Sequence, residues 1–505
     1  MRKRYLLLGA LLVAAVTWPF FLPGEFVWRD MVILDAPGWT AANFGGGDLP
    51  ARNSPQDGLL AIAGLVGLGG VLARALIVGA ASAAAWAGYR FGHTPVGTCA
   101  AMVLAVINPF VVERLLQGQW SLAVAAWLLP AIAVADKHRT AWLCMCGAAI
   151  TPTGGLFALA TGTLTVRGRR VATFGIGTLL CLPWLVPGLL HPGASMHAAA
   201  SATAFAPRAE AFTGTLGTLA GLGGIWNAAA VPASRAAGFA LFGFLLAPLV
   251  VAGTTRLPRR TLAALGALAA IGVVVPLVAW LAPELIAQLL RAVPGAGLIR
   301  DSHKLVALAI PLYVAALGTL RGQTAWAGLV TAALLVPDAP WALQALTPSK
   351  KPVINEALVR ELAGKDVYFA DRGPLVRIDD TVSVDPYSKA VGAVESGELV
   401  VDGERVDDPA PRWLAAHAAW GRGDLKALED LGIGAVVEND QVVAQTDAPP
   451  TPVPWALTAG WLLIPAGLVA RAAALRSAGR SSATSSGTRD RAPRNRGRGG
   501  GRGHR

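Results

Sequence analysis

Carboxylates and cations recur in four separate segments of this largely apolar chain. The first segment, EFVWRDMVILDAPGW at residues 25–39, carries Glu25, Asp30 and Asp35 directly after a hydrophobic stretch. A membrane anchor gains nothing from carboxylates beside the bilayer, whereas a carboxylate can accept a proton from an attacking hydroxyl. Arg and Lys can hold a phosphate, Arg as a planar fork and Lys as a point charge. Together these residue types fit the transfer of a sugar from a lipid phosphate.

The candidate catalytic residues are Asp30 and, as the alternative, Asp35. Asp30 directly follows Arg29, so a local ion pair explains it as well as a catalytic role does. Asp35 precedes the residues APGW, and a role in setting this turn is the simpler interpretation. Asp30 is therefore the better candidate for a catalytic base.

Three further segments supply the residues that we predict to bind substrate. They are NPFVVERLLQGQW at 108–120, GGIWNAAAVPASR at 223–235 and IRDSHK at 299–304. The candidates within them are Glu113, Arg114, Gln117, Gln119, Trp226, Asn227, Arg235, Arg300, His303 and Lys304. Ionisable groups at a membrane interface are costly unless they are paired or hydrated. Four segments that supply such groups therefore indicate a shared polar site.

This prediction competes with structural interpretations of the same residues. We expect Asp30, Glu113, Arg300 and Lys304 to line one cavity open to the outer leaflet. Glu113 could equally fix a short interfacial helix, and basic side chains at the mouth of a span often snorkel to the interface. Trp226 is more simply an interfacial anchor than a surface on which a sugar stacks.

The composition indicates an integral membrane protein. Of 505 residues, 54% are hydrophobic and 15% are charged, and the mean hydropathy is +0.51. Soluble proteins carry about a quarter charged residues. The net charge of +12 is concentrated in residues 473–505, which hold nine Arg and one Asp, while residues 341–453 hold 19 acidic and 11 basic residues. The high pI therefore does not indicate a specific nucleic acid partner.

The cysteines and histidines predict no metal site. Cys99, Cys144, Cys146 and Cys181 lie in apolar segments, and the C-x-C pair has no His or Cys partner at zinc-site spacing. Buried small side chains are the simpler interpretation. The cofactors are unknown at this stage, and a requirement for a divalent metal stays open.

Hydropathy predicts about twelve transmembrane segments. MRKR precedes YLLLGALLVAAVTWPFFLP, which spans about 30 Å as a helix and so reads as the first span. Further apolar segments centre on residues 72–90, 94–108, 120–135, 171–190, 236–254, 261–282, 305–320, 324–338 and 454–472. Residues 141–166 are broken by TPTGG, which predicts two short helices or a re-entrant pair.

The basic residues predict the orientation of these spans. If the spans alternate, one side receives MRKR, Arg90, DKHR at 136–139, RGRR at 167–170, TTRLPRR at 254–260, Arg321 and the Arg-rich tail. Positive charge favours the cytoplasmic side. The prediction is a multi-pass protein of the plasma membrane with both termini in the cytoplasm.

The remaining sequence divides the chain into four parts. Residues 1–340 form the multi-spanning part, and residues 341–453 contain strand-like DVYFAD and ELVVDGERV with helix-like RGDLKALEDLG. This second part predicts a small extracytoplasmic α/β domain before the last span at 454–472. Residues 473–505 are rich in Ser, Gly and Arg and predict a disordered cytoplasmic tail. The fold class is thus an all-α polytopic membrane protein with one small α/β domain.

Several of these segments resemble a known family. RDMVILDAPGW with LPARNSPQD, then NPFVVERLLQGQW, GGIWNAAAVPASR and IRDSHK, occur in an order similar to that of actinobacterial multi-spanning proteins. These look like members of the GT-C glycosyltransferase superfamily, relatives of polyprenyl-phosphate-dependent mannosyl- and arabinosyltransferases of cell-envelope synthesis. The resemblance covers roughly residues 1–340. It implies a GT-C-like helical bundle embedded in membrane lipids.

The resemblance also implies an activity and roles for individual residues. It implies inverting transfer of a sugar from a polyprenyl-phosphate donor to an envelope glycan, glycolipid or protein acceptor outside the membrane. Asp30, or Asp35 as the alternative, would be the base, and Arg300 and Lys304 would face the lipid phosphate. Many members carry adjacent or closely spaced acidic pairs in the first loop, whereas these two aspartates are five residues apart. This departure leaves the base and the need for a metal open.

Two other classes of protein are alternatives to a glycosyltransferase. A transporter or flippase of a lipid-linked precursor should show repeated halves and ionisable residues near the bilayer midplane. The sequence shows no such repeat, and its charged groups cluster towards one face. A non-catalytic membrane scaffold is the third interpretation, and it predicts that the acidic region 341–453 matters more than Asp30.

Overall fold

The structure is a computed structural model that describes residues 2–190, 196–293, 295–349, 352–378 and 381–486. Its contacts divide the chain into two units, Met1–Trp461 and Leu462–Arg505, and each is described by itself. The first unit holds a bundle of apolar helices and a smaller region that contains most of the strands. The second unit holds the C-terminal part of helix α23 (Ala456–Ser486).

The apolar segments of the sequence form helices. Among the described residues, eight helices are long and apolar enough to cross a membrane: Lys3–Phe21, Gly69–Phe91, Pro95–Leu116, Arg170–Leu190, Arg259–Leu281, Ser302–Thr319, Gly322–Leu346 and Ala456–Ala474. Two shorter apolar helices, Trp120–Val134 and Phe239–Thr254, correspond to the segments predicted at 120–135 and 236–254. The chain is thus mostly helical and carries several membrane-type helices.

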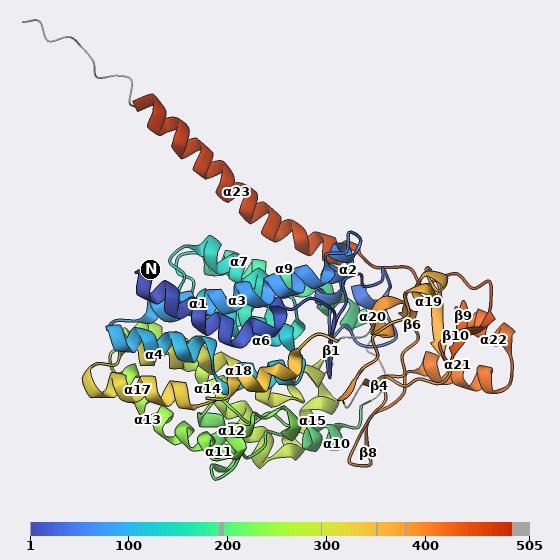
Figure 1. The fold of residues 1–505 in the computed structure, drawn as a ribbon, viewed down its shortest axis with the longest axis horizontal. Helices are drawn as coiled ribbons and strands as arrows, with labels where there is room; N and C mark the ends of the chain where they lie inside the picture. Colours follow the sequence, from blue (N-terminus) through green and yellow to red (C-terminus); the bar gives the residue numbers. More distant parts are fainter. Residues whose placement is uncertain (1, 191–195, 294, 350–351, 379–380, 487–505) are drawn as a thin grey trace, which may run out of the picture. The chain divides into compact units, whose positions relative to one another are not determined.

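Among the described residues, the bundle contains the eighteen α-helices α1 to α18, most of which are labelled in Figure 1. The first nine are α1 (Lys3–Thr17), α2 (Gln56–Gly64), α3 (Gly69–Phe91), α4 (Pro95–Val106), α5 (Pro109–Leu116), α6 (Trp120–Val134), α7 (His138–Ala148), α8 (Pro152–Thr165) and α9 (Arg170–Leu190). The others are α10 (Ala198–Ala204), α11 (Gly214–Ala220), α12 (Ala233–Ala236), α13 (Phe242–Thr254), α14 (Arg259–Leu281), α15 (Pro283–Ala292), α16 (Ile310–Thr319), α17 (Gly322–Leu334) and α18 (Ala339–Ala342). The broken segment at 141–166 therefore lies in two short helices, α7 and α8.

Local sequence explains why the span Pro95–Leu116 bends between α4 and α5. Asn108 caps α5 because its side chain accepts a hydrogen bond from the backbone N–H of Val111. Pro109 occupies the first helical position, where the missing N–H costs nothing. This break places Glu113 and Arg114 on a separate short helix at the end of the span.

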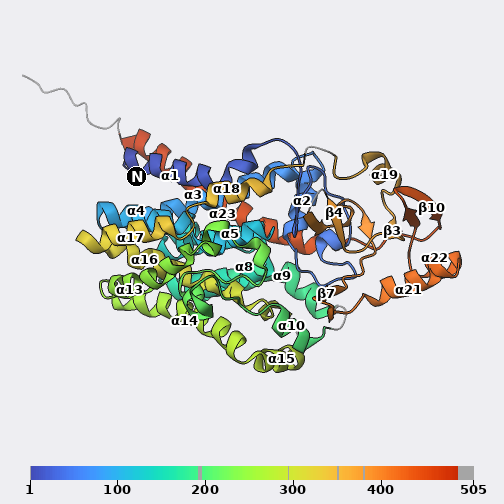
Figure 2. The ribbon, with the colours of Figure 1, turned by 60° about the horizontal axis from the view of Figure 1, so that its bottom comes forward.

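The basic connections gather at one end of the bundle. The backbone N–H of His93 donates to the carbonyl of Gly318 at 2.8 Å, and Thr319 Oγ1 donates to the carbonyl of Gly253 at 2.8 Å. Arg90 pairs with Asp136 at the same end. Figures 1 and 2 both show the strands at the opposite end of these helices. The polar segments that could do chemistry lie towards the strands.

Residues 352–453, the α/β region, contain a mixed four-stranded sheet and two hairpins. The sheet order is β10-β9-β3-β6, with β3 parallel to β6 and β9, and β9 antiparallel to β10. The strands are β3 (Asp366–Phe369), β4 (Leu375–Ile378), β5 (Thr381–Val384), β6 (Gly392–Ala393), β7 (Leu399–Val401), β8 (Glu404–Asp407), β9 (Ala435–Glu438) and β10 (Gln441–Gln445). The helices are α19 (Glu356–Glu361), α20 (Tyr387–Ala390), α21 (Pro411–Gly421) and α22 (Leu425–Asp430).

Side-chain alternation along β3 gives the sheet two apolar faces. Tyr368 packs with residues of α21 and α22, whereas Val367 and Phe369 pack on the other face. Val32 and Leu34 belong to the core on that second face. The loop that follows the first membrane-type helix therefore shares a hydrophobic core with the α/β region, although the sequence separates them by more than three hundred residues.

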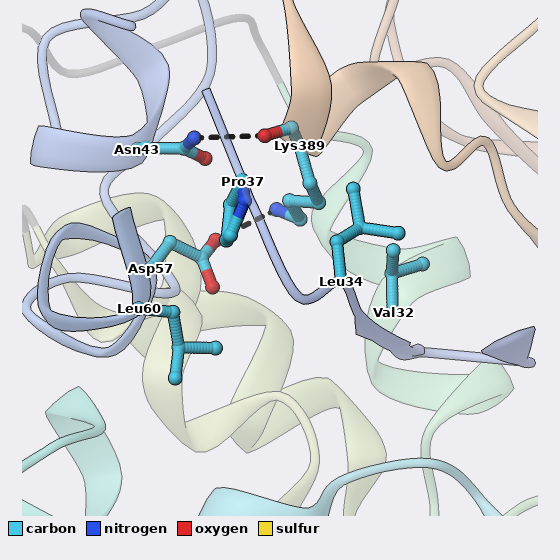
Figure 3. Close-up of a pocket in the computed structure, with 7 residues that line it drawn as sticks. All are labelled: Val32, Leu34, Pro37, Asn43, Asp57, Leu60 and Lys389. Atoms are coloured by element: carbon cyan, nitrogen blue, oxygen red, sulfur yellow. Dashed lines mark hydrogen bonds and ion pairs between the residues drawn. The ribbon is translucent and has the colours of Figure 1, made fainter. Parts of the chain in front are cut away.

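Polar contacts also join the loop after the first helix to the α/β region (Figure 3). Lys389 Nζ lies 2.7 Å from Asp57 Oδ2, and Asn43 Nδ2 donates to the carbonyl of Lys389 at 3.0 Å. Gly38 also approaches closely, because a Cβ at this position would lie 2.1 Å from the carbonyl oxygen of Ala390. Only glycine fits there, so the loop and α20 are held together.

Two predicted boundaries differ from the structure. The helix Gly322–Leu346 continues past residue 341, where the α/β domain was expected to begin. Helix α23 continues to Ser486, so the expected disordered tail from residue 473 begins within a helix. Residues 487–505 of that tail lie outside the described residues.

Candidate active site

A two-residue hairpin turn carries the first candidate, Asp30. Strands β1 (Phe26–Trp28) and β2 (Met31–Ile33) are antiparallel, and Trp28 pairs with Met31 across the turn. Arg29 has φ = 51°, a left-handed conformation that is uncommon for a residue other than glycine. Such a residue persists only where the surroundings fix it. The contacts of the turn show what fixes it.

The helical bundle holds one side of the turn. The backbone N–H of Asp30 donates to the carbonyl of Gln117 at 3.2 Å, and Arg29 Nη1 donates to the carbonyl of Leu116 at 3.1 Å. Gly118 has φ = 88°, and a Cβ there would lie 2.4 Å from the backbone nitrogen of Met31. Glycine at 118 thus permits the close approach of the 116–119 loop to the turn.

The Asp30 carboxylate accepts two amide hydrogen bonds and remains exposed. Gln117 Nε2 and Gln119 Nε2 donate to Asp30 Oδ2 at 3.2 and 3.0 Å. Although solvent reaches the side chain, the surrounding protein partly desolvates it, and this burial raises its pKa. The hydrogen bonds from Gln119 and Gln117 oppose the rise. Arg29 interacts electrostatically with Asp30 but forms no ion pair with it within 4 Å, since its guanidinium donates to the carbonyls of Leu116 and Ala229.

A chain of polar contacts leads from Asp30 to a lysine. Gln119 Oε1 accepts from Arg114 Nη1 at 2.8 Å, and Arg114 forms a forked pair with Asp301 at 2.6 and 3.1 Å. Lys304, in the 3₁₀ helix Ser302–Ala309, lies 3.9 Å from Asp301. Burial acts to raise the pKa of Asp301, but Arg114 and Lys304 outweigh it and lower this pKa to about 2. Asp301 therefore remains ionised and holds both cations.

Two cations, Lys304 and Arg52, lie near the Asp30 carboxylate, and a third, Arg300, lies near both of them. Lys304 and Arg52 both interact electrostatically with Asp30 and with Arg300. The side chain of Arg52 is 55% exposed, that of Lys304 is 23% exposed, and that of Arg300 is 13% exposed. An exposed carboxylate thus lies beside cations that solvent can reach.

The α/β region partly neutralises two of these cations. Arg300 Nη1 donates to both oxygens of Asp407, in β8, at 2.9 and 2.8 Å. Arg52 Nη2 lies 3.6 Å from the same carboxylate, and Arg300 stacks over the ring of Phe205 at 4.5 Å. Lys304 pairs instead with Asp301, so Arg300 is the cation most firmly tied to the α/β region.

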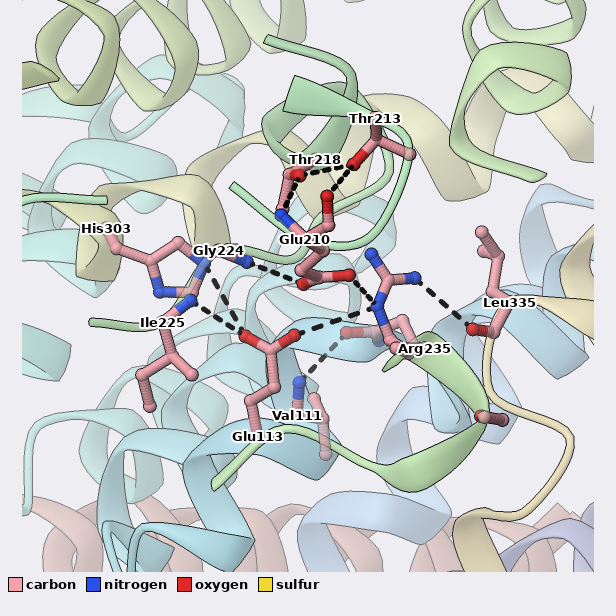
Figure 4. A network of polar contacts seen from close by, with 12 residues as sticks. Val111, Glu113, Glu210, Thr213, Thr218, Gly224, Ile225, Arg235, His303 and Leu335 are labelled. Carbon is pink, nitrogen blue, oxygen red and sulfur yellow. Dashed lines mark hydrogen bonds and ion pairs between the residues drawn. The ribbon is translucent and has the colours of Figure 1, made fainter. Parts of the chain in front are cut away.

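A second cluster of charges is fully buried (Figure 4). Arg235 Nε pairs with Glu210 Oε2 at 2.5 Å and lies 4.0 Å from Glu113 Oε1. Glu113 Oε2 accepts from the backbone N–H of Ile225 at 3.1 Å and lies 3.9 Å from His303 Nε2. The side chains of Glu113, Arg235 and His303 are 0% exposed. The expectation that Glu113 lines an open cavity is therefore wrong.

His303 connects the two clusters. Its Nδ1 lies 2.7 Å from Arg114 Nη2, while its other ring nitrogen faces Glu113. Phe110 packs against the ring with centroids 5.4 Å apart. Four predicted residues, Glu113, Arg114, Arg235 and His303, thus lie in one buried layer behind the exposed site.

The two predicted residues from 226–227 lie beside this layer. Asn227 Nδ2 donates to Gln117 Oε1 at 2.7 Å, so it fixes the amide that contacts Asp30. Trp226 packs edge-on against Phe205 with centroids 4.9 Å apart. Its indole nitrogen is buried, which does not match an interfacial anchor with a hydrated N–H.

Asp35 has a different set of contacts from Asp30. Its carboxylate lies 3.7 Å from Arg74 Nη1, and its backbone N–H donates to Glu25 Oε1 at 2.9 Å. Its carbonyl accepts from the N–H of Gly69, where α3 begins. These contacts favour a structural role for Asp35.

Sequence reasoning missed several residues of the two clusters. Arg52 and Asp301 lie within recognised polar segments, and their charge was the signal that could have identified them. Glu210 and Asp407 stand in segments without distinctive neighbours, so only the fold reveals that they pair with Arg235 and Arg300.

Among the residues that the structure describes, no three His, Cys, Asp or Glu side chains form a group that could hold a metal ion. The chain matches no protein-family model, no curated protein and no solved structure. A functional interpretation therefore depends on the geometry of the site.

Proposed function

We propose that this chain is a membrane glycosyltransferase of the GT-C type. It transfers a sugar from a polyprenyl-phosphate donor to an envelope glycan, glycolipid or protein acceptor outside the plasma membrane. One observation carries the proposal: the exposed carboxylate of Asp30 lies near the solvent-accessible cations Lys304 and Arg52, which in turn lie near Arg300. A base and a phosphate-binding group in one open site are what this reaction requires.

The proposed reaction gives each group one role. Asp30 accepts the proton of the acceptor hydroxyl, and the resulting oxygen attacks the anomeric carbon of the donor sugar. The bond from this carbon to the phosphate oxygen breaks, and the phosphate leaves with the electron pair. Lys304 and Arg52, with Arg300 released from Asp407, stabilise its negative charge. Attack opposite the leaving phosphate inverts the anomeric centre.

The proposed topology places this site outside the cell. The basic connections at one end of the bundle would face the cytoplasm by the positive-inside rule. The eight long helices, the two shorter apolar helices and the pair α7–α8 would together make about twelve passes. Both termini would then be cytoplasmic, and the α/β region would be extracytoplasmic.

Turnover by matched variants tests the proposal. Purified protein in lipid receives a polyprenyl-phosphate sugar and an envelope acceptor, and product is measured for wild type, Asp30→Asn and Asp35→Asn. We expect turnover by wild type, near-wild-type turnover by Asp35→Asn and turnover lower by about a hundredfold or more by Asp30→Asn. Equal turnover by wild type and Asp30→Asn would remove Asp30 as the base, and no turnover by wild type with any donor would oppose the activity.

The buried cluster favours a second candidate, a transporter or flippase of a lipid-linked precursor. Ionisable side chains inside membrane-type helices are typical of transport pathways. However, Glu113 lies in the last turn of the span Pro95–Leu116, and His303 lies at the start of the span Ser302–Thr319. Both therefore lie at the end of a helix rather than at its middle. Movement of a labelled polyprenyl-phosphate lipid across protein-containing vesicles, with no sugar transfer, would favour this candidate.

A further inference from the structure

The α/β region holds the backbone of the turn that carries Asp30. The N–H of Arg29 donates to Ser383 Oγ at 3.0 Å, and the N–H of Val384 donates to the carbonyl of Arg29 at 2.8 Å. Both polar backbone groups of Arg29 are therefore bound by strand β5. Ser383 is 0% exposed, so water does not compete for its hydroxyl.

The pleat of β5 explains why a serine lies at this position. Ser383 points inward, while its neighbour Val382 is 45% exposed. Strand β5 is paired with β4 in a hairpin whose register joins Val376 to Ser383. A hydroxyl at an inward position can satisfy a backbone N–H that an apolar side chain would leave without a partner.

The turn is thus held from two sides by different parts of the chain. The loop 116–119 of the bundle contacts the side chain of Arg29 and the N–H of Asp30. Strand β5 contacts the N–H and the carbonyl of Arg29. The left-handed conformation of Arg29 depends on these restraints, since it is unfavourable for a side chain larger than glycine's hydrogen.

We infer that the α/β region positions Asp30 for the reaction and that Ser383 is the positioning residue. Ser383 acts through Arg29 and does not touch substrate. This role rests on the proposed function, because positioning matters for turnover only if Asp30 is the base. The α/β region is then a part of the active site rather than an appended module.

The inference predicts that loss of the Ser383 hydroxyl lowers kcat but leaves KM for the donor almost unchanged. Without the Ser383 hydroxyl, the turn gains freedom and the Asp30 carboxylate spends less time at the reacting distance. A misplacement of about 1 Å can cost about a hundredfold in rate. We expect kcat to fall about tenfold to a hundredfold, whereas KM for the donor stays within about twofold because Lys304 and Arg52 do not contact Ser383.

The experiment compares Ser383→Ala with Ser388→Ala. Ser388 is a matched control, because its buried hydroxyl makes one hydrogen bond in the same region, in which it donates to the carbonyl of Asp385 and not to the hairpin β1–β2. Hydrogen–deuterium exchange of the full chain in lipid reports on the peptide that contains residues 26–33. We expect faster exchange of the Arg29 amide in Ser383→Ala only. Ser383→Thr keeps the hydroxyl and should restore slow exchange and turnover.

Hydrogen–deuterium exchange and kinetics together distinguish failure of the positioning role of Ser383 from failure of the proposed function. Equal exchange in Ser383→Ala and Ser388→Ala would overturn the positioning role, whatever the activity. Faster exchange in Ser383→Ala with kcat equal to that of Ser388→Ala would also overturn it. Absence of turnover by wild type would instead oppose the proposed function, and the exchange data would still show whether Ser383 holds the turn.

Discussion

The Asp30 turn and the buried Glu113 cluster use similar residues in opposite environments. Asp30 is exposed, accepts only amide hydrogen bonds and lies near cations that solvent reaches. Glu113 is fully buried, and its neighbours Arg235 and Glu210 are almost completely enclosed. A carboxylate of the first kind can meet a substrate and exchange a proton, whereas one of the second kind mainly fixes helices and loops.

The two regions are nevertheless coupled. Arg114 contacts Gln119 on the side of Asp30 and His303 on the side of Glu113. Buried ion pairs are costly to break because the remaining charge stays without a partner. The buried layer therefore holds Gln119 and Lys304 in place. Exposure to solvent distinguishes the residues of the candidate site from the buried residues that position them.

The comparison predicts its largest effect for Asp30→Asn. Turnover should fall by about a hundredfold to ten thousandfold, the usual contribution of a general base. The thermal unfolding midpoint should stay unchanged, because the side chain is exposed and asparagine can still accept from Gln117 and Gln119. Initial rates and thermal unfolding in the same detergent check both expectations. A marked loss of stability would place Asp30 with the structural residues instead.

The buried region should respond in the opposite way. Arg235→Met leaves Glu113 and Glu210 without a counter-ion, so the free energy of unfolding should fall by about 3–5 kcal/mol. The control is Arg405→Met, which breaks an exposed pair with Glu398 and should cost less than about 1 kcal/mol. Denaturant unfolding measures both. Similar small losses in the two variants would show that burial does not distinguish the regions.

Lys304→Met should weaken donor binding more than it slows the reaction. Loss of a charged hydrogen bond to phosphate costs about 1.5–3 kcal/mol, so KM for the donor should rise about tenfold to a hundredfold. Arg300→Met should give a smaller rise, because Asp407 already pairs with Arg300. Lys365→Met, which removes a surface contact to Gln445, is the control. An unchanged KM in Lys304→Met would exclude this lysine from the phosphate site.

The smallest predicted effect is a displacement of the pH profile. Burial raises the pKa of Asp30 above its ordinary value of 3.8, and a base must be deprotonated to act. Activity should therefore fall with decreasing pH at a midpoint above 3.8, while the residual rate of Asp30→Asn should lack this step. Rates between pH 3 and pH 8 measure it. A midpoint at or below the ordinary value would contradict the partly desolvated environment of Asp30.

Hydropathy and strand patterns predicted much of the fold. The segments DVYFAD and ELVVDGERV form β3 and the hairpin β7–β8, and the apolar segments form helices, because local patterns of apolar residues decide these elements. The pairing of the first loop with the α/β region could not be predicted. Val32 and Leu34 are ordinary strand residues in the sequence, and only the fold brings them against Val367.

The site was predicted less completely than the fold. Asp30, Gln117, Gln119 and Lys304 do lie near one another, as their position after successive spans suggested. Sequence could not separate exposed from buried charges, since Glu113 and Asp30 look equally available in an outer segment. Arg114 and Asp301 are 187 residues apart, and a local sequence pattern cannot predict that two such distant residues form a pair.

The distance along the chain between Arg29 and the residue that binds its backbone N–H has a consequence for biosynthesis. Ser383 follows Arg29 by 354 residues. At roughly 5–20 residues per second, a ribosome takes on the order of 20–70 s to add them. The turn that carries Asp30 therefore stays incomplete until most of the polypeptide has been synthesised. The restraint on the Arg29 backbone therefore forms late in synthesis, and a chain truncated before strand β5 would carry this turn without its two backbone hydrogen bonds to that strand.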